Sequence, residues 1–126
     1  MRLLLDTQVV LWELQGGRAV QARARRAIEE AKEIAFSVVS FAEIGVKVAI
    51  GKLVVPDDLR DHIVASGLTI LGLAPEHGLG VSELPLHHRD PFDRLLISQA
   101  REEGLTVITA DRRFADYDIP VIDAGA

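Results

Sequence analysis

Four carboxylates lie where a parallel α/β sheet would bring them together. Asp6 ends the apolar run RLLLD, and Asp111 follows the strand-like segment TVITAD. Glu43 lies in the first turns of SFAEIGVKVAI, and Asp93 opens the helix-like DPFDRLLISQA. In open α/β sheets, ligands bind outside the carboxyl ends of the strands, and three of these four acids belong there. The spacing therefore predicts that the acids share one site.

Acids that converge in this way repel one another unless cations lie between them. Carboxylate oxygens are hard ligands that suit Mg²⁺, and Mn²⁺ is an alternative. Divalent ions held by such acids activate water for attack on phosphates. The pattern predicts a metal-dependent nuclease with Asp6, Glu43, Asp93 and Asp111 as both catalytic residues and metal ligands.

Each acid also has a structural interpretation. Asp6 and Asp111 could each cap the helix that follows its strand. Glu43 could complete a capping box with Ser40, and Asp93 could favour the dipole of its helix. These local roles stay open for every acid taken alone, and the joint placement is what favours a site.

Asp90 competes with Asp93 for the third ligand position. Asp90 stands immediately before Pro91, as an N-cap residue does, so we expect Asp93 to be the ligand and Asp90 its structural partner. His87 and His88 lie just upstream, and imidazole can bind metals or transfer protons. A histidine in a loop is more often a surface or hydrogen-bonding residue, and we assign both to that class.

Composition describes an ordinary folded chain. The 126 residues fit one domain, 1–126, with 48% hydrophobic and 26% charged residues. No apolar stretch reaches the roughly 18–20 residues of a membrane span, and the amino terminus shows no signal-peptide pattern. With no cysteine, a metal must be held by oxygen or imidazole, and a cytoplasmic protein is expected.

The net charge of −5 argues at first against a nucleic-acid partner. Two bound Mg²⁺ ions would offset most of this charge, so much of the acidity could belong to the site. The basic residues are also unevenly spread, and five of the fourteen fall in one short stretch: Arg18, Arg23, Arg25, Arg26 and Lys32. Local charge therefore matters more than the net value.

Short apolar runs alternate with segments of helical periodicity along the whole chain. The expected strands span 3–5, 34–37, 68–73, 107–109 and 120–122. The expected helices span 7–14, 20–31, 40–50, 56–66, 76–83, 91–103 and 112–115. This alternation predicts right-handed crossovers in a three-layer α/β/α sandwich with a central, mostly parallel sheet of about five strands.

The motifs resemble those of PIN-domain ribonucleases, and within them the VapC-type toxins of toxin–antitoxin pairs. The similar segments occur in the family's order and cover most of the chain: LLLDTQVVLW, SVVSFAEIGVKVAIGKL, LPLHHRDPFDRLLISQA and TVITADRRF. The pair DPFDRLLISQA and ITADRRF is the specific part of the signal. A mild departure is Phe41-Ala42, which replaces the more usual Trp near the glutamate.

The resemblance implies a metal-dependent endoribonuclease with the four acids as its site. It matches Thr7, Ser40 and Thr109 to small polar positions that orient those acids. It also implies an RNA substrate, a small antitoxin protein that silences the enzyme, and a homodimer. We expect RNA phosphates to contact Arg94, Arg112 and Arg113, which lie beside the acids in sequence.

An antitoxin groove would need apolar walls, for which the sequence offers residues from two helices: Leu11, Trp12, Leu14, Val46, Val48, Ile50 and Leu53. Core packing is the alternative for each of them. Two other functions stay open: a non-catalytic PIN-fold module that binds proteins, and a receiver-like phosphoacceptor domain. The receiver requires an Asp after the third strand, where LGLAPEH stands, and a Lys after the fifth, where VIDAGA stands.

Overall fold

The computed structural model describes residues 1–16 and 20–125, and a parallel sheet forms its centre. The strands are β1 (Arg2–Leu5), β2 (Glu33–Ser37), β3 (Thr69–Leu71), β4 (Thr106–Thr109) and β5 (Val121–Asp123). They lie in the order β3-β2-β1-β4-β5, and every pairing between neighbours is parallel. The predicted sheet is confirmed, with β3 shorter than the expected 68–73.

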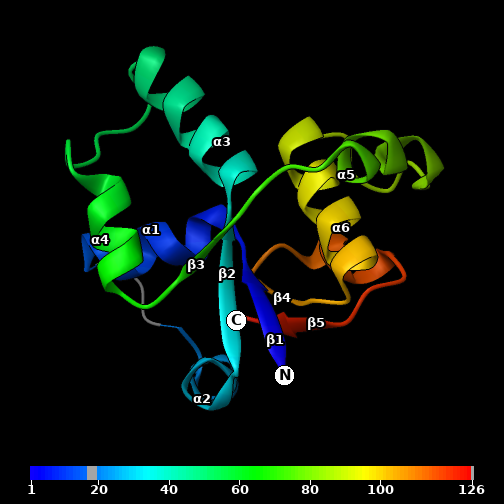
Figure 1. The fold of residues 1–126 in the computed structure, drawn as a ribbon, viewed down its shortest axis with the longest axis horizontal. Helices are drawn as coiled ribbons and strands as arrows, with labels where there is room; N and C mark the ends of the chain where they lie inside the picture. Colours follow the sequence, from blue (N-terminus) through cyan, green and yellow to red (C-terminus); the bar gives the residue numbers. More distant parts are fainter. Residues whose placement is uncertain (17–19, 126) are drawn as a thin grey trace.

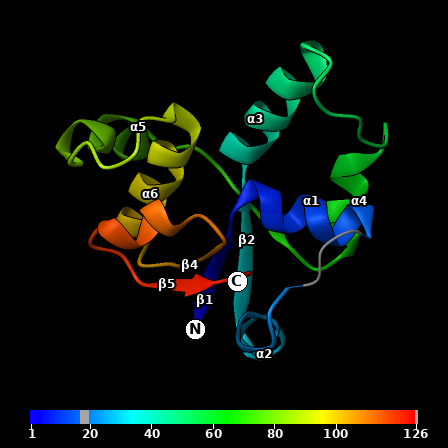
Figure 2. The same ribbon diagram turned by 180° about the vertical axis from the view of Figure 1, so that it is seen from behind.

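Helices cover both faces of the sheet. They are α1 (Thr7–Gln15), α2 (Ala22–Glu30), α3 (Val38–Ala49), α4 (Leu59–Ala65), α5 (Pro75–Gly80) and α6 (Pro91–Glu103), with short 3-10 helices η1 (Val81–Glu83) and η2 (Arg112–Asp116). In Figure 1, α1 and α4 lie on one side of the strands and α5 and α6 on the other, and the view from behind in Figure 2 keeps this division. The three-layer α/β/α architecture is therefore confirmed.

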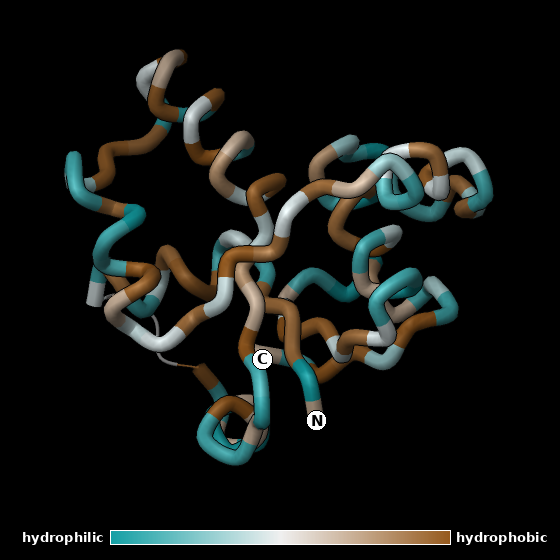
Figure 3. The backbone as a smooth tube through the Cα atoms, viewed as in Figure 1, coloured by the Kyte–Doolittle hydropathy of each residue, from teal (hydrophilic) through white to brown (hydrophobic). Residues whose placement is uncertain are grey.

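Alternate residues of β1 face two separate apolar cores. Leu3 and Leu5 pack in the core beneath α1, α2 and α4, whereas Leu4 packs in the core beneath α6. A strand buried on both faces needs such a continuous apolar run. The central strands are mostly brown in Figure 3, which marks this hydrophobic interior. Among the described residues, no helix is both long and apolar enough to cross a membrane.

The strand order reverses next to β1. The chain moves outward from β1 to β2 and β3, and then returns to place β4 on the other side of β1. The backbone N–H of Asp6 donates to the carbonyl of Ile108 at 3.0 Å, which joins the carboxyl ends of β1 and β4. Such a switch point is where open α/β sheets bind ligands.

The start of α3 differs from the prediction. Ser37, not Ser40, is the N-cap, and its hydroxyl oxygen accepts from the backbone N–H of Val39 at 3.0 Å. The capping box expected between Ser40 and Glu43 is therefore wrong, because both residues lie inside the helix. Glu43 is left available for a different role.

The start of α4 also differs from what the sequence indicated. The helix expected from Pro56 begins at Leu59, because residues 56–58 form a turn closed by the Leu59 N–H on the Pro56 carbonyl. Arg18, part of the predicted basic stretch, lies outside the described residues. Its neighbours Arg23, Arg25 and Arg26 are exposed on α2.

Candidate metal-binding active site

The four predicted acids line one cleft of about 320 Å³ at the carboxyl edge of the sheet. Asp6 lies between β1 and α1, and Asp111 lies between β4 and η2. Glu43 comes from the second turn of α3, and Asp93 from the first turn of α6. Each acid is thus held by a different helix terminus or helix, as the topology requires.

Thr109 connects two of the acids. Its hydroxyl donates to Asp6 Oδ2 at 2.7 Å and accepts from the Asp111 N–H at 3.0 Å. Asp6 is buried at 8% exposure and its carboxylate makes no cap on α1. The expected orienting role of Thr109 agrees with these contacts, and the capping alternative for Asp6 does not.

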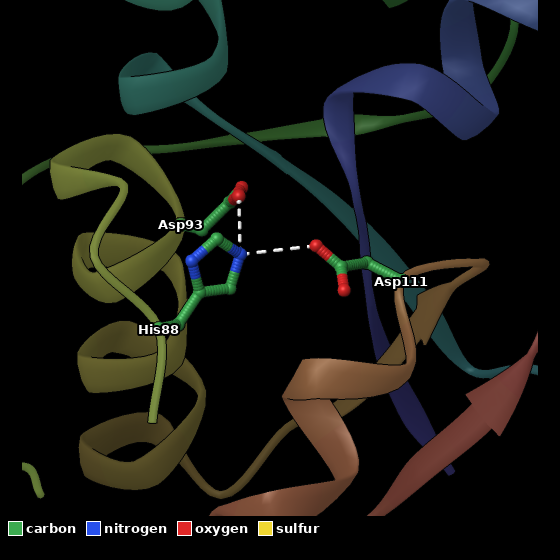
Figure 4. Close-up of side chains that lie close together, drawn as sticks. All are labelled: His88, Asp93 and Asp111. Carbon is green, nitrogen blue, oxygen red and sulfur yellow. Dashed lines mark hydrogen bonds and ion pairs between the residues drawn. The ribbon is translucent and has the colours of Figure 1, made fainter. Parts of the chain in front are cut away.

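His88 joins the other two acids. Its Nε2 lies 2.8 Å from Asp93 Oδ2 and 3.0 Å from Asp111 Oδ2, so one ring nitrogen faces both carboxylates (Figure 4). His88 is 2% exposed, and its ring packs edge-on against Phe114. The sequence analysis placed His88 in the hydrogen-bonding class but missed its place in the site.

The other nitrogen of His88 determines where the proton sits. Nδ1 accepts from the backbone N–H of Asp90 at 3.2 Å, so Nδ1 carries no hydrogen in this arrangement. The proton of the neutral ring is then on Nε2, which donates to the carboxylates of Asp93 and Asp111. In this tautomer His88 positions the two acids as a hydrogen-bond donor.

Burial and mutual repulsion disfavour ionisation of two acids. Burial, followed by the negative charges of Asp6 and Asp90, raises the pKa of Asp93 to about 8. Burial likewise raises the pKa of Asp6 to about 6, with the charge of Glu43 adding to it and the hydrogen bond from Thr109 opposing it. A divalent cation between these carboxylates would relieve the repulsion.

Asp111 behaves differently because cations and donors surround it. Burial works to raise its pKa, but hydrogen bonds from the side chain and backbone of Arg113 and from His88 outweigh it and lower the pKa. The Arg113 guanidinium reaches both Asp111 oxygens, at 3.1 and 3.0 Å. Asp111 also caps η2 through the Arg113 N–H, so its capping and site roles coexist.

Glu43 is the least satisfied of the acids. It is 7% exposed, and its Oε2 accepts from Lys47 Nζ at 2.9 Å. Its Oε1 is buried and has no hydrogen-bond partner among the described residues. A buried carboxylate oxygen without a donor is energetically costly, and a cation bound beside it would offset that cost.

Asp90 caps α6, as predicted. Its Oδ1 accepts from the N–H groups of Phe92 at 2.8 Å and Asp93 at 3.2 Å. The side chain of Asp93, one turn further, points instead to His88 and the cleft (Figure 4). The geometry favours Asp93 over Asp90 as a ligand.

Two of the expected orienting residues contact each other instead of the acids. The Thr7 hydroxyl donates to Ser40 Oγ at 2.7 Å, and both side chains are buried. This bond ties α1, whose N-cap residue is Asp6, to α3, which carries Glu43 in its second turn. Any effect of Thr7 and Ser40 on the acids is therefore exerted through these two helices, and the orienting role expected for them stays a prediction.

Arg94 bonds to acceptors of the protein itself and not, as expected from the sequence, to a phosphate. Its guanidinium donates to four backbone carbonyls and to the Tyr117 hydroxyl, at 3.1 to 3.3 Å: Val81, Leu84, Pro85 and His88 supply the carbonyls. Because these acceptors use the fork of Arg94, this residue holds the loop that carries His88. Arg112 and Arg113 remain exposed at the rim.

The expected groove walls divide between core and surface. Leu11 is 3% exposed and belongs to the core, which overturns its assignment as a wall. Trp12, Leu14 and Leu53 are partly buried against that core. Val46 and Val48 on α3 and Ile50 at its C-cap are exposed, as a docking surface requires: their exposed fractions are 48%, 42% and 61%.

The fold and the cleft together define an α/β protein with an acidic site suited to a hard divalent cation. Most of the donors are carboxylate oxygens, and one ligand atom each from His88, Asp93 and Asp111 lies within 4.8 Å of the others. The buried, unpartnered Oε1 of Glu43 fits the same requirement.

The chain belongs to the PIN domain family, which matches residues 3–120. It is 29% identical to Ribonuclease VapC22 of Mycobacterium tuberculosis, over 94% of this chain and 93% of that protein. The resemblance seen in the sequence is thereby confirmed.

Solved structures show the same fold. VapBC2 from Rickettsia felis, bound to a DNA fragment from its promoter, contains a similar chain with a TM-score of 0.76 and 19% identity, covering 99% of this chain and 100% of that one. DNA-bound VapBC from Salmonella typhimurium gives a TM-score of 0.66 and 16% identity, with 98% of each chain covered.

The raised pKa values make stability depend on pH. The folded protein retains protons on Asp6 and Asp93 that the unfolded chain releases, so metal-free stability should fall as pH rises from about 4 to about 8. Asp93→Asn should reduce this fall and exceed wild-type stability near pH 8 by about 1 to 3 kcal/mol. Urea unfolding in a chelator measures both.

The matched control is Asp118→Asn, since Asp118 is exposed. It should keep the wild-type pH profile, and Mg²⁺ should flatten the profile of wild type but not that of Asp93→Asn. Equal slopes in all three proteins would refute the repulsion argument.

Two substitutions of His88 test whether its Nε2–H donor is what the metal site requires. Gln can place an N–H near the Nε2 position, whereas the shorter Asn can satisfy only the Asp90 N–H. We expect His88→Asn to weaken Mn²⁺ binding by about 10- to 100-fold, because Asp93 and Asp111 lose their shared donor, and His88→Gln to retain more of it. Mn²⁺ titration followed by electron paramagnetic resonance measures this, with exposed His87→Asn as control. Identical affinities for the Asn and Gln variants would contradict the assignment.

Proposed function

We propose that this protein is a metal-dependent endoribonuclease and the toxin of a toxin–antitoxin pair. The observation that carries the proposal is the convergence of Asp6, Glu43, Asp93 and Asp111 on one cleft, with a Glu43 oxygen left buried and unpartnered. Membership of the PIN domain family and the name of the ribonuclease relative support it.

Mg²⁺ is the proposed cofactor, with Mn²⁺ as an alternative. Asp6 and Asp93 would hold the first ion most directly, and Glu43 and Asp111 would complete the site or hold a second ion through water. When bound, the metal supplies an activated water as nucleophile and offsets negative charge at the scissile phosphate. The carboxylate oxygens of this chain are ligands of the type that both ions prefer.

The other residues of the cleft organise this reaction. Thr109 holds Asp6, and His88 holds Asp93 and Asp111 at hydrogen-bond distance from one nitrogen. Arg112 and Arg113, exposed at the rim, are proposed contacts for RNA phosphates. Hydrolysis of this kind does not need the 2′-hydroxyl as nucleophile, and it leaves 5′-phosphate and 3′-hydroxyl ends. With RNA as substrate, the proposed location is the cytoplasm.

The non-catalytic module is the competing proposal. A module that only binds proteins has no use for several buried carboxylates that raise one another's pKa, as those of Asp6 and Asp93 are raised. The receiver-like alternative lacks its phosphoacceptor, because Gly72 and Leu73 follow β3. Activity assays separate enzyme from module.

Removing one acid should abolish cleavage and leave the fold intact. Asp6→Asn or Asp93→Asn should lower the Mg²⁺-dependent cleavage rate by at least about 100-fold, because a neutral amide binds Mg²⁺ poorly. The assay follows fragments of a labelled RNA, with 5′-end sequencing to define the site, and Asp118→Asn as control. Near-wild-type activity of purified Asp93→Asn would refute the assignment. If Asp90→Asn were inactive and Asp93→Asn active, Asp90 and not Asp93 would be the metal ligand.

An antitoxin is the proposed protein partner. The similar chains from Rickettsia felis and Salmonella typhimurium were solved as VapBC complexes. Here Val46, Val48 and the C-cap residue Ile50 expose apolar surface along the last turns of α3, the helix that carries Glu43. A helical antitoxin segment could cover that surface while a basic side chain reaches the acids. A homodimer of the toxin chain is part of the same proposal.

Expression should reveal the partner. Induction of the chain alone should arrest growth, and co-expression with the product of the adjacent reading frame should restore growth and yield an inactive complex. Asp93→Asn, induced alone, should be harmless and should still form the complex. If the wild-type chain is harmless and no partner co-purifies from native cells, the toxin proposal fails even where nuclease activity survives.

A further inference from the structure

Lys47 is a cation that lines the acidic cleft. It lies one turn after Glu43 on α3, its Nζ is 2.9 Å from Glu43 Oε2, and it shares the cleft with Asp6, Asp93 and Asp111. Its side chain is 42% exposed, so the ammonium group sits at the mouth of the cleft. None of the roles assigned so far uses this residue.

The contact differs from an ordinary pair on a helix surface. An exposed Glu–Lys pair four residues apart contributes little to stability, because water solvates both groups. Here the Glu43 side chain is only 10% exposed, and Lys47 satisfies one oxygen while Oε1 has no partner among the described residues. A single ammonium therefore compensates this carboxylate only in part.

Cations are distributed unevenly over the cleft. Among the described residues, Glu43 pairs with Lys47 at one rim and Asp111 pairs with Arg113 at the other. Neither Asp6 nor Asp93 has a Lys or Arg partner in this part of the chain. The divalent cation of the proposed function would compete with the ammonium of Lys47 for Glu43.

We propose that Lys47 is a further phosphate-binding residue, inside the cleft, and that it changes partner when a divalent cation binds. It pairs with Glu43 until a divalent cation takes that carboxylate, and it then binds a non-bridging phosphate oxygen of the RNA. The long, flexible stem of lysine permits this change without movement of α3. The inference rests on the proposed nuclease function.

The test uses Lys47→Met, which keeps the helix and removes the charge, and Lys52→Met as the matched control on an exposed lysine past the end of α3. Loss of a cation that competes for Glu43 should tighten Mn²⁺ binding by roughly tenfold. Loss of a phosphate contact should weaken binding of a short single-stranded RNA, measured in Ca²⁺ to block cleavage, by about tenfold and lower the salt slope by about 0.7. Lys47→Arg should bind RNA as wild type does.

The opposite directions of the two effects distinguish this role from a structural one. A lysine that merely stabilised α3 would weaken Mn²⁺ binding when replaced, or leave it unchanged, and either result would overturn the inference. The inference would also fail if Lys47→Met bound RNA with the same affinity and salt slope as Lys52→Met while the wild-type protein cleaved RNA. A wild-type protein that binds Mn²⁺ but neither binds nor cleaves RNA would overturn the proposed function and this inference together.

Discussion

Repulsion between carboxylates in one partly buried cleft is the constraint on which the site depends. Desolvation and mutual charge raise the pKa values of Asp6 and Asp93, so ionising both without a cation is unfavourable. The surrounding donors offset this cost: Thr109 at Asp6, His88 between Asp93 and Asp111, and cationic side chains at the two rims. The metal-free protein thereby maintains an arrangement that a divalent cation can complete.

The parallel sheet makes this crowding possible. The parallel pairing of β1 with β4 places their carboxyl ends at the same edge, and the helices that follow these strands begin there. Asp93 in the first turn of α6 gains from the positive end of the helix dipole. The two apolar cores on either side of β1 hold these termini in place, so packing energy supports an electrostatically unfavourable centre.

The predictions that proved wrong concern residues whose local sequence pattern fits two different structural roles. Ser37 and Ser40 both precede helical residues, and the structure shows that Ser37, the last residue of β2, caps α3. Arg94 beside Asp93 reads as a phosphate contact, but the loop before α6 surrounds it with acceptors. Leu11 has the character of a groove wall and lies in the core. Side chains whose partners are distant in sequence are the ones that local patterns misplace.

Sequence alone determined the succession of strands and helices along the chain, the parallel sheet, and the placement of four acids at its carboxyl edge. Apolar periodicity, caps such as Asp90-Pro91 and the strand-ending acids are properties of neighbouring residues, so they are readable without coordinates. Only the tertiary structure decided that His88 donates to Asp93 and Asp111, and that Glu43 keeps one oxygen unpartnered. Those relations depend on how close α3, α6 and the loops after β4 and η1 approach one another, and that distance is a product of packing rather than of local sequence.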